Sequence, residues 1–312
     1  MTAWTVLAIY YSNLPVLLRP PAAFLFAVAS ITAFVLSLRR RHFKLFLLAA
    51  CAVVLVWWLL IPPSNARNWQ PDVAVVPWAE IRGNLVTLHN IRNCDYRSET
   101  SYTVRHYDKT FDINTMRSID FLQIYWGSPL IAHTMLSFGF ADGQYVCFSI
   151  ETRKEIGEEY SALKGFFKQY ELTYVIGDER DLVRLRTNYR NEDVYLYRLN
   201  APMDLARHVF LDYLEEINRL KAQPAWYNAL TSNCTTNIRS HTAPYNPNAR
   251  LDWRIIVNGY IDEMIYEQNF MNRSMPFPEL KKLSHINARA RIAGADPLFS
   301  QLIRQGLPGM EK

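Results

Sequence analysis

Two long apolar runs near the N-terminus constrain the fold of this chain more than any other feature. They are Ala22–Leu38 and Leu45–Ile61, and neither contains a charged residue. As a helix, each is close to the length needed to cross the hydrocarbon core of a bilayer, about 30 Å. The basic segment Arg39–Lys44 lies between them, and the positive-inside tendency keeps it in the cytoplasm. The sequence therefore predicts a membrane hairpin with Trp57 and Trp58 near its outer end and the rest of the chain outside the cytoplasm.

The first apolar stretch, Trp4–Leu18, is shorter, and it is interrupted by Ser12, Asn13 and Pro15. It is predicted either to form a third span or to lie in the membrane interface. Both alternatives leave the large domain on the same side. A cleaved signal peptide is a competing interpretation, but it is weaker because the second long run would still anchor the chain.

Composition divides the 312 residues into three segments. Residues 1–61 are predicted to be a membrane anchor with two or three transmembrane helices, residues 62–77 a polar linker, and residues 78–312 an outer domain. The outer domain is long enough for one sizeable core. The formal net charge of +5 includes the cytoplasmic turn and is too small to indicate a nucleic-acid partner. It is compatible with a position above anionic lipid headgroups.

The outer domain is predicted to be α+β, with an antiparallel sheet and a cysteine-bearing helix. Two alternating runs flank Ala-Asp-Gly within Ala132–Arg153, which indicates a β-hairpin. Paired strands are expected within Trp78–Ser98, and further strands over Leu172–Thr187 and Asp193–Asn200. Pro202–Gln223 has apolar residues at helical spacing and leads directly into the cysteine segment.

The segment around Cys234 has the features of a nucleophile at the start of a helix. Ser232 and Asn233 are residue types that cap helices, so Cys234 is expected in the first helical turn. A thiolate there is favoured by the positive end of the helix dipole. The alternative is that Cys234 is a small buried apolar residue, as most lone cysteines are, and the local sequence alone favours this alternative.

The cysteine count limits disulfide formation. Cys51 lies inside a predicted membrane helix, which leaves Cys94, Cys147 and Cys234 in the outer domain. Three cysteines cannot all pair within one chain, so at least one outer thiol is free or modified.

A thiol nucleophile needs a base, and His133 is the best candidate among the seven histidines. It opens the first strand of the predicted hairpin, and Glu151 lies near the end of the facing strand, so the two should be neighbours. A carboxylate beside an imidazole fixes its tautomer and stabilises its protonated form. An ordinary cross-strand ion pair is an equally good explanation of the pair. The less suitable histidines are His42, His89, His106, His208, His241 and His285.

The order of these residues resembles a known group of enzymes. His133, then Glu151, then Cys234 after an asparagine is similar to the circularly permuted papain-like enzymes, which include lecithin:retinol acyltransferase-like and NlpC-type members. More specifically, the stretches His133–Thr187 and Tyr227–Ile238 resemble the Lnb N-terminal periplasmic domain family. The resemblance extends over most of the chain from about Trp78 to Phe270.

That family name is associated with lipoprotein N-acylation, so the resemblance implies a thioester-forming acyltransferase at the periplasmic face of the bacterial inner membrane. Cys234 would be the nucleophile, His133 the base and Glu151 the group that orients it. A membrane phospholipid would donate the acyl chain, and an amine, such as the N-terminus of a lipoprotein, would accept it. The helix-start amides would hold the oxyanion, with Asn233 and Tyr227 as candidate side-chain donors unless they only cap and pack.

Two arginines are candidates for binding a phosphate headgroup. Arg153 and Arg180 each carry a guanidinium that can hold phosphate oxygens with two parallel bonds, although charge-rich segments are more often solvated faces. No cofactor is expected. A zinc site is disfavoured because the cysteines and histidines show no close paired spacing.

Two other function classes remain open at the level of sequence. A cell-wall peptidase or amidase would use the same three residues with water as the acceptor. A non-catalytic envelope binding protein would use the hairpin as a scaffold and bury Cys234 in its core.

Overall fold

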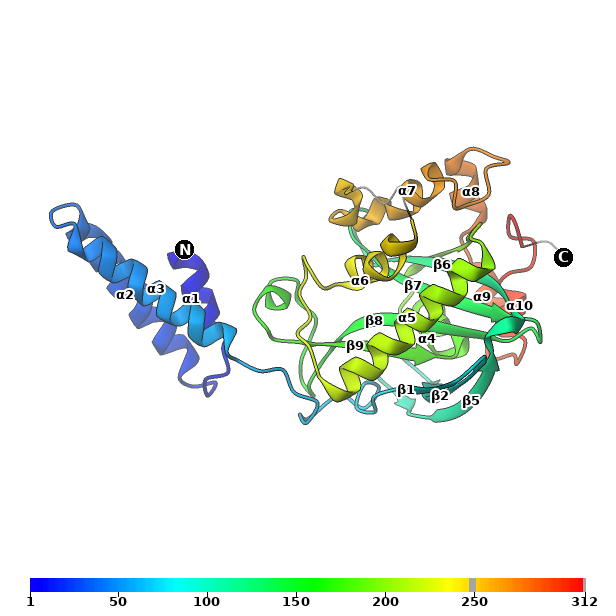
Figure 1. Cartoon of the computed structure of the whole chain (residues 1–312), viewed down its shortest axis with the longest axis horizontal. Coiled ribbons are helices and arrows are strands. Elements are labelled where there is room, and N and C mark those ends of the chain that lie inside the picture. The colour runs from blue at the N-terminus through cyan, green and yellow to red at the C-terminus, as the bar shows by residue number, and fades with distance from the viewer. Residues whose placement is uncertain (247–250, 311–312) are drawn as a thin grey trace.

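The structure is a computed structural model that describes residues 1–246 and 251–310, and it has two parts (Figure 1). An N-terminal group of three helices contains α1 (Thr2–Tyr10), α2 (Arg19–Ser37) and α3 (His42–Leu59). The helices α2 and α3 are long and apolar enough to cross a membrane, and most of their apolar side chains are exposed. Both predicted membrane runs are therefore helical. The α1 helix has 9 residues, and at 1.5 Å per residue its length is about 14 Å, which is too short to span a bilayer.

The larger part is built on one mixed sheet with strand order β1-β2-β9-β8-β7-β6-β10. A further strand, β5, also pairs with β2. Neighbouring strands are antiparallel except β2 and β9, whose parallel contact at Arg92 and Gly177 corrects the expected antiparallel sheet. A separate pair comprises β3 (Asp95–Tyr96) and β4 (Tyr102–Thr103). The strands of the main sheet are β1 (Trp78–Arg82), β2 (Leu85–Arg92), β5 (His106–Asp112), β6 (Met116–Tyr125), β7 (Ala132–Phe140), β8 (Tyr145–Arg153), β9 (Glu171–Gly177) and β10 (Asp193–Arg198).

Helices cover both faces of this sheet. The long helix α5 (Met203–Ala222) crosses one face together with α6 (Cys234–Thr242) and α7 (Ile261–Glu267) (Figure 1). The other face carries α4 (Glu179–Arg184) and α9 (Asn287–Ala293), with α10 (Phe299–Leu302) beside them. A further helix, α8 (Phe277–Leu283), packs through Leu280 against the core on the α5 side.

Strand β7 contributes to both cores because successive side chains of a strand point to opposite faces. Leu136 and Phe138 pack in the core on the α5 side, which contains Phe210. Met135 belongs to the other core, together with Phe299. The face to which a β7 residue points can therefore be read from its position.

The β7–β8 hairpin confirms the turn predicted at Ala-Asp-Gly. The strand predicted over Leu172–Thr187 is correct only as far as Gly177. There the chain turns into α4, because the Asp178 side chain accepts the Arg180 N–H and caps the new helix.

Candidate functional site

Cys234 is the first residue of α6, and the preceding residue closes the helix start. The Asn233 side chain accepts the Thr236 N–H at 2.9 Å, while the Thr236 hydroxyl accepts the Asn233 N–H at 2.9 Å. This reciprocal pair is a capping box. Cys234 is 8% exposed and is unpaired, so its thiol stands at the positive end of the helix dipole.

Asn258 connects this helix start to the beginning of β7. Its side chain accepts the Ala132 N–H at 2.9 Å and donates to the Ala132 carbonyl at 2.7 Å. The same amide nitrogen lies 2.8 Å from the Thr235 hydroxyl and 4.0 Å from the Cys234 sulfur. The β7–β8 pairing ends at Met135, and Asn258 bonds to the backbone beyond that point. Sequence reasoning missed Asn258, because nothing local marks a residue that is 126 positions from one partner and 23 from the other.

On strand β7 itself, His133 is part of a hydrogen-bonded chain. The Ser149 hydroxyl donates to Glu151 at 2.7 Å and lies 2.7 Å from His133 Nε2. A hydroxyl has one proton, so Ser149 must accept from Nε2. In that tautomer Nδ1 carries the free lone pair. Glu151 also accepts a hydrogen bond from Arg186 at 3.1 Å. The sequence prediction thus placed His133 and Glu151 on one face correctly, but it missed the serine between them.

The charges in this chain are set by burial and by Arg186. Burial, assisted by the Arg186 charge, lowers the pKa of His133 to about 3, so its imidazole is neutral near pH 7. Burial tends to raise the pKa of Glu151, but the Arg186 guanidinium outweighs it and keeps that pKa well below its usual range. Glu151 favours the protonated ring of His133 as expected, but burial and the Arg186 charge outweigh it and lower the pKa of His133.

His133 and Cys234 lie on different sides of β7. His133 shares its face with Met135 and bonds to Ser149 there, whereas Cys234 belongs to the core on the α5 side. Within residues 1–246 and 251–310, no hydrogen bond joins the imidazole to the thiol. The link between the two is indirect and runs through Asn258 and Ala132. The role of His133 as the base remains a prediction.

An apolar cavity of about 140 Å³ lies next to the start of α6, and its lining includes Thr235 but not Cys234 itself. Thr235 and Thr134 line it, so the residues next to Cys234 and to His133 both face this space. The remaining lining comes mostly from aliphatic and aromatic side chains of β6, β7, α5, α6, α7 and the segment before α7, including Phe121, Leu136, Leu205, Val209, Ile238, Ile255, Ile261 and Met264. The sequence did not predict this cavity.

The site residues lie within a region that matches a known protein family. The family model described as the Lnb N-terminal periplasmic domain matches residues 102–259, just over half of the chain. The chain belongs to the Lnb N-terminal periplasmic domain family. The matched region contains His133, Glu151, Cys234 and Asn258. No curated protein and no solved structure matches the chain.

Family membership indicates a periplasmic domain, and the apolar helices α2 and α3 are consistent with attachment of that domain to a membrane. This agrees with the predicted localisation at the level of a membrane-associated periplasmic protein. The relationship to papain-like enzymes and the circular permutation remain predictions.

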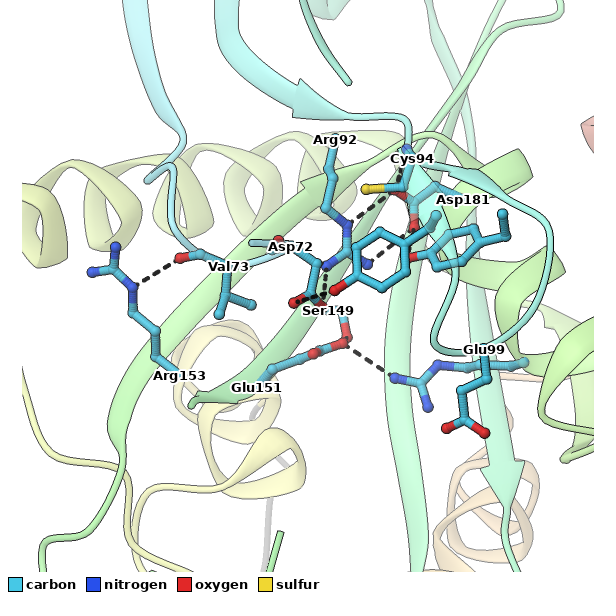
Figure 2. Close-up of polar contacts among 12 residues, drawn as sticks. Asp72, Val73, Arg92, Cys94, Glu99, Ser149, Glu151, Arg153 and Asp181 are labelled. Atoms are coloured by element: carbon cyan, nitrogen blue, oxygen red, sulfur yellow. Dashed lines mark hydrogen bonds and ion pairs between the residues drawn. The ribbon is translucent and has the colours of Figure 1, made fainter. Parts of the chain in front are cut away.

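Arg153 serves the fold. Its guanidinium donates to the Val73 carbonyl at 2.9 Å, to the Ala74 carbonyl at 2.8 Å and to the Asn65 side chain at 2.8 Å (Figure 2 shows the Val73 contact). It also lies over the Trp69 ring. These contacts tie the linker to the sheet. Each of its three guanidinium nitrogens has a partner within the chain and the side chain is buried, which argues against the predicted headgroup contact.

The other three predicted ligand-binding residues also have partners in the chain. Arg180 makes two bonds to Asp178, at 3.0 and 2.8 Å. The Asn233 amide donates to the Ala229 carbonyl at 2.8 Å, so both ends of its side chain are in use. Tyr227 is buried against Gly165, and burial raises its pKa. These contacts favour the capping and packing roles over side-chain oxyanion donors.

The other two outer thiols are in a different environment from Cys234. Cys94 lies beside the buried Arg92–Asp181 pair, where its N–H donates to Asp181 at 2.7 Å (Figure 2). Burial and the Asp181 charge raise the pKa of Cys94 to about 12. Burial likewise raises the pKa of Cys147. Both thiols are therefore protonated at neutral pH. Across the described residues, no group of three or more Cys, His, Asp or Glu could hold a metal ion.

Proposed function

We propose that this chain is a membrane-anchored thiol acyltransferase of the periplasm, which moves an acyl chain from a phospholipid through Cys234 to an amine. The observation that carries the proposal is the position of Cys234 at a capped helix N-terminus, where the next residue, Thr235, lines an apolar cavity. A helix start favours a thiolate, and an apolar cavity accepts a hydrocarbon chain. The amine of a lipoprotein N-terminus is the acceptor that the family resemblance suggests.

The reaction has two balanced steps. The Cys234 thiolate attacks the ester carbonyl carbon of the phospholipid, a carbon–sulfur bond forms, the ester carbon–oxygen bond breaks, and the lysophospholipid leaves after taking a proton. The acceptor amine then attacks the thioester, a carbon–nitrogen bond forms, and the thiolate is released while the amine loses a proton. Dividing one acyl transfer into two steps lowers the barrier of each.

The backbone at the start of α6 supplies the oxyanion donors. Thr236 N–H is taken by the cap, but the N–H groups of Cys234 and Thr235 have no intrahelical partner, as in any helix start. Two such groups beside the sulfur can stabilise the negative oxygen of the tetrahedral intermediate. The side chains of Asn233 and Tyr227 are not needed for this role.

His133 is the proposed base, and its hydrogen bond to Ser149 must be considered first. Its Nε2–H is held by Ser149, so Nδ1 is the atom that can accept the thiol proton. The ring must move towards Cys234 when substrate is bound, because it now projects to the α4 side. Catalytic hydrogen bonds are often long or absent before substrate binds.

The cavity limits the length of acyl chain that can be held next to the start of α6. At about 140 Å³ it is close to an engineered protein cavity of about 150 Å³ that holds benzene. It can therefore take a stretch of roughly six carbons, the part of an acyl chain next to the thioester. Polar side chains are a minority of the lining, so a hydrocarbon chain suits it better than a peptide backbone does; they are Thr134, Thr235, Arg239, Thr242, Asn246 and Gln268.

Labelling with an alkyne-bearing phospholipid tests the proposal. The purified full chain in detergent–lipid micelles should acquire the alkyne acyl group, and Cys234→Ala should lose it. Cys147→Ala is the matched control, because that thiol is also buried and unpaired, and it should be labelled like the parent chain. Labelling of Cys234 only by peptide-like probes would favour the peptidase or amidase. Equal lipid labelling of Cys234→Ala would contradict the proposal.

One observation favours a second candidate, a non-catalytic protein that binds lipid chains in the same cavity. The imidazole of His133 is bonded away from the thiol, so Cys234 has no hydrogen-bonded base among the described residues. This candidate predicts that a photoreactive fatty acid labels residues around the cavity, while no thioester forms at Cys234.

A further inference from the structure

The loop between β8 and β9 carries an apolar surface next to the membrane hairpin. Tyr160, Leu163 and Phe166 on this loop are 46%, 46% and 40% exposed, and Leu230 beside them is 48% exposed. The loop and the segment of Leu230 are joined, because Ala229 N–H donates to the Gly165 carbonyl at 3.2 Å. We call Tyr160, Leu163, Phe166 and Leu230 the loop surface.

The base of this loop is fixed to the outer end of the hairpin. The Lys168 ammonium donates to the carbonyls of Trp58, Leu59 and Ile61 at 3.0, 3.0 and 3.3 Å, where α3 ends. Cationic groups stabilise the exposed carbonyls at a helix C-terminus. The Gln169 amide donates to the Tyr11 carbonyl at 2.6 Å. The loop is therefore held where α3 is expected to leave the membrane.

Aromatic packing fixes the same junction. Phe167 stacks on Tyr11 with ring centroids 5.5 Å apart, and Trp4 lies 5.2 Å from Trp58 and 6.2 Å from Phe167. The Trp226 indole donates to the Ile61 carbonyl at 3.1 Å. Tryptophan and tyrosine concentrate at membrane interfaces, because an apolar ring and a polar group suit that depth. Figure 1 shows the loop, in green, projecting from the domain towards the hairpin.

We propose that the loop surface is a second membrane contact, which inserts Tyr160, Leu163, Phe166 and Leu230 into the outer leaflet of the bilayer crossed by α2 and α3. The occupant is the lipid, because the surface is continuous with the membrane end of the hairpin, where Lys168 joins the loop to the end of α3. The inference rests on α2 and α3 spanning the membrane, and it does not depend on any reaction at Cys234.

The surface also has a consequence for the site. Leu230 lies four residues before Cys234, and the turn between them is closed by mutual backbone bonds of Asn228 and Ser232 at 3.2 and 3.0 Å. A loop surface seated in the leaflet would therefore hold the start of α6 close to the lipid.

Depth-dependent quenching tests this contact in the full chain. Leu163→Cys, in a Cys234→Ala background, is labelled with an NBD fluorophore and placed in nanodiscs of phosphatidylcholine and phosphatidylglycerol that contain a phospholipid with a nitroxide near its headgroup. Leu298→Cys is the matched control, because Leu298 is 53% exposed and lies near α10, away from the hairpin. Leu48→Cys on α3 reports whether the hairpin is in the membrane.

We expect at least twofold stronger quenching at Leu163→Cys than at Leu298→Cys, with blue-shifted emission, and strong quenching at Leu48→Cys. Quenching at Leu48→Cys together with equal values at Leu163→Cys and Leu298→Cys would overturn the second contact and leave the anchor intact. Absence of quenching at Leu48→Cys as well would overturn the anchor and the contact together. Neither result depends on acyl transfer, since Cys234 is replaced throughout.

Discussion

The two faces of the sheet around β7 carry side chains of different kinds, polar and hydrogen-bonded on one face and apolar on the other. On the α4 side, His133, Ser149, Glu151 and Arg186 form a continuous hydrogen-bonded chain, and a second buried network surrounds Arg304. On the α6 side, the side chains are almost entirely apolar and leave a cavity of about 140 Å³.

The polar face is therefore the harder one to change, and the apolar face is the one that can bind a ligand. Buried polar groups with all their partners in place are costly to disturb, because any change leaves a donor or a charge unpaired. Apolar packing with an unfilled volume can instead accept a ligand without losing a hydrogen bond. Substitutions in the Arg304 network should therefore act mainly on stability, and those in the cavity mainly on acyl binding. Replacement of His133 should affect both stability and transfer.

The largest expected effect is the loss of the buried ion cluster on the α4 side. Arg304 donates to Asp120 at 2.8 Å and to Glu179 at 2.7 Å, and both carboxylates are fully buried. Arg304→Ala should lower the free energy of unfolding by about 3–5 kcal/mol, because it leaves the buried Glu179 carboxylate without a cation, while Asp120 keeps only Arg198. The control Arg82→Ala removes an exposed pair with Glu80 and should change it by no more than about 0.5 kcal/mol. Urea unfolding in micelles measures both, and equal effects would contradict the comparison.

The second effect concerns acid stability through His133. Its pKa is about 3 in the folded chain and near 6.5 when unfolded, so the unfolded state binds more protons between these values. The stabilisation is complete above pH 6.5 and is lost as pH falls, by up to about 1.4 kcal/mol per pH unit. His133→Gln should flatten the stability profile between pH 6.5 and 5. An unaltered slope in His133→Gln would show that His133 is not buried as described.

The third effect tests the cavity on the α6 side. Ile238→Trp would place extra volume into the space beside Thr235 and should reduce lipid labelling of Cys234 by about tenfold, with a loss of about 1–3 kcal/mol in stability from overpacking. Ile292→Trp makes the same change at an exposed position on α9 and should affect neither property. Equally fast labelling of both variants would show that the cavity does not hold the acyl chain.

The smallest expected effect concerns the contact between the linker and the sheet. Glu171 accepts the Ser64 N–H at 3.0 Å and pairs with Arg67 at 2.8 Å, yet burial raises its pKa to about 7. Because the pKa of this carboxyl is higher in the folded than in the unfolded chain, its contribution to the free energy of unfolding is lost as pH rises from about 4.5 to about 7. Glu171→Gln should therefore be better tolerated at pH 8 than at pH 5. Thermal unfolding at the two pH values measures this, and a greater loss at pH 8 would contradict the pKa assignment.

Local patterns in the sequence predicted several elements correctly. The charge-free runs predicted α2 and α3, the Ala-Asp-Gly turn predicted the β7–β8 hairpin, and Asn233 predicted the start of α6. Each of these depends on residues close together in the chain. The error at Leu172–Thr187 arose because apolar residues continue past Gly177, while a single capping residue, Asp178, changes the structure from strand to helix.

Such local patterns could not predict how the site residues lie relative to one another in space. Alternation places His133 and Glu151 on one face, but it does not say which face α6 will cover, and this decides whether the imidazole meets Cys234. Asn258 is brought to Ala132 only by the tertiary fold. The cavity is a volume left between packed elements, and no residue in the sequence encodes it alone.

The most direct test of the central claim is the intact mass of the chain purified from membranes, measured before and after hydroxylamine. The account predicts an added acyl mass on a fraction of the protein, removed by hydroxylamine because thioesters are cleaved by it, and absent from Cys234→Ala but present in Cys147→Ala. A folded, membrane-inserted wild-type chain that carries no acyl mass even after incubation with phospholipid in the absence of an amine acceptor would contradict the claim that Cys234 carries the acyl chain.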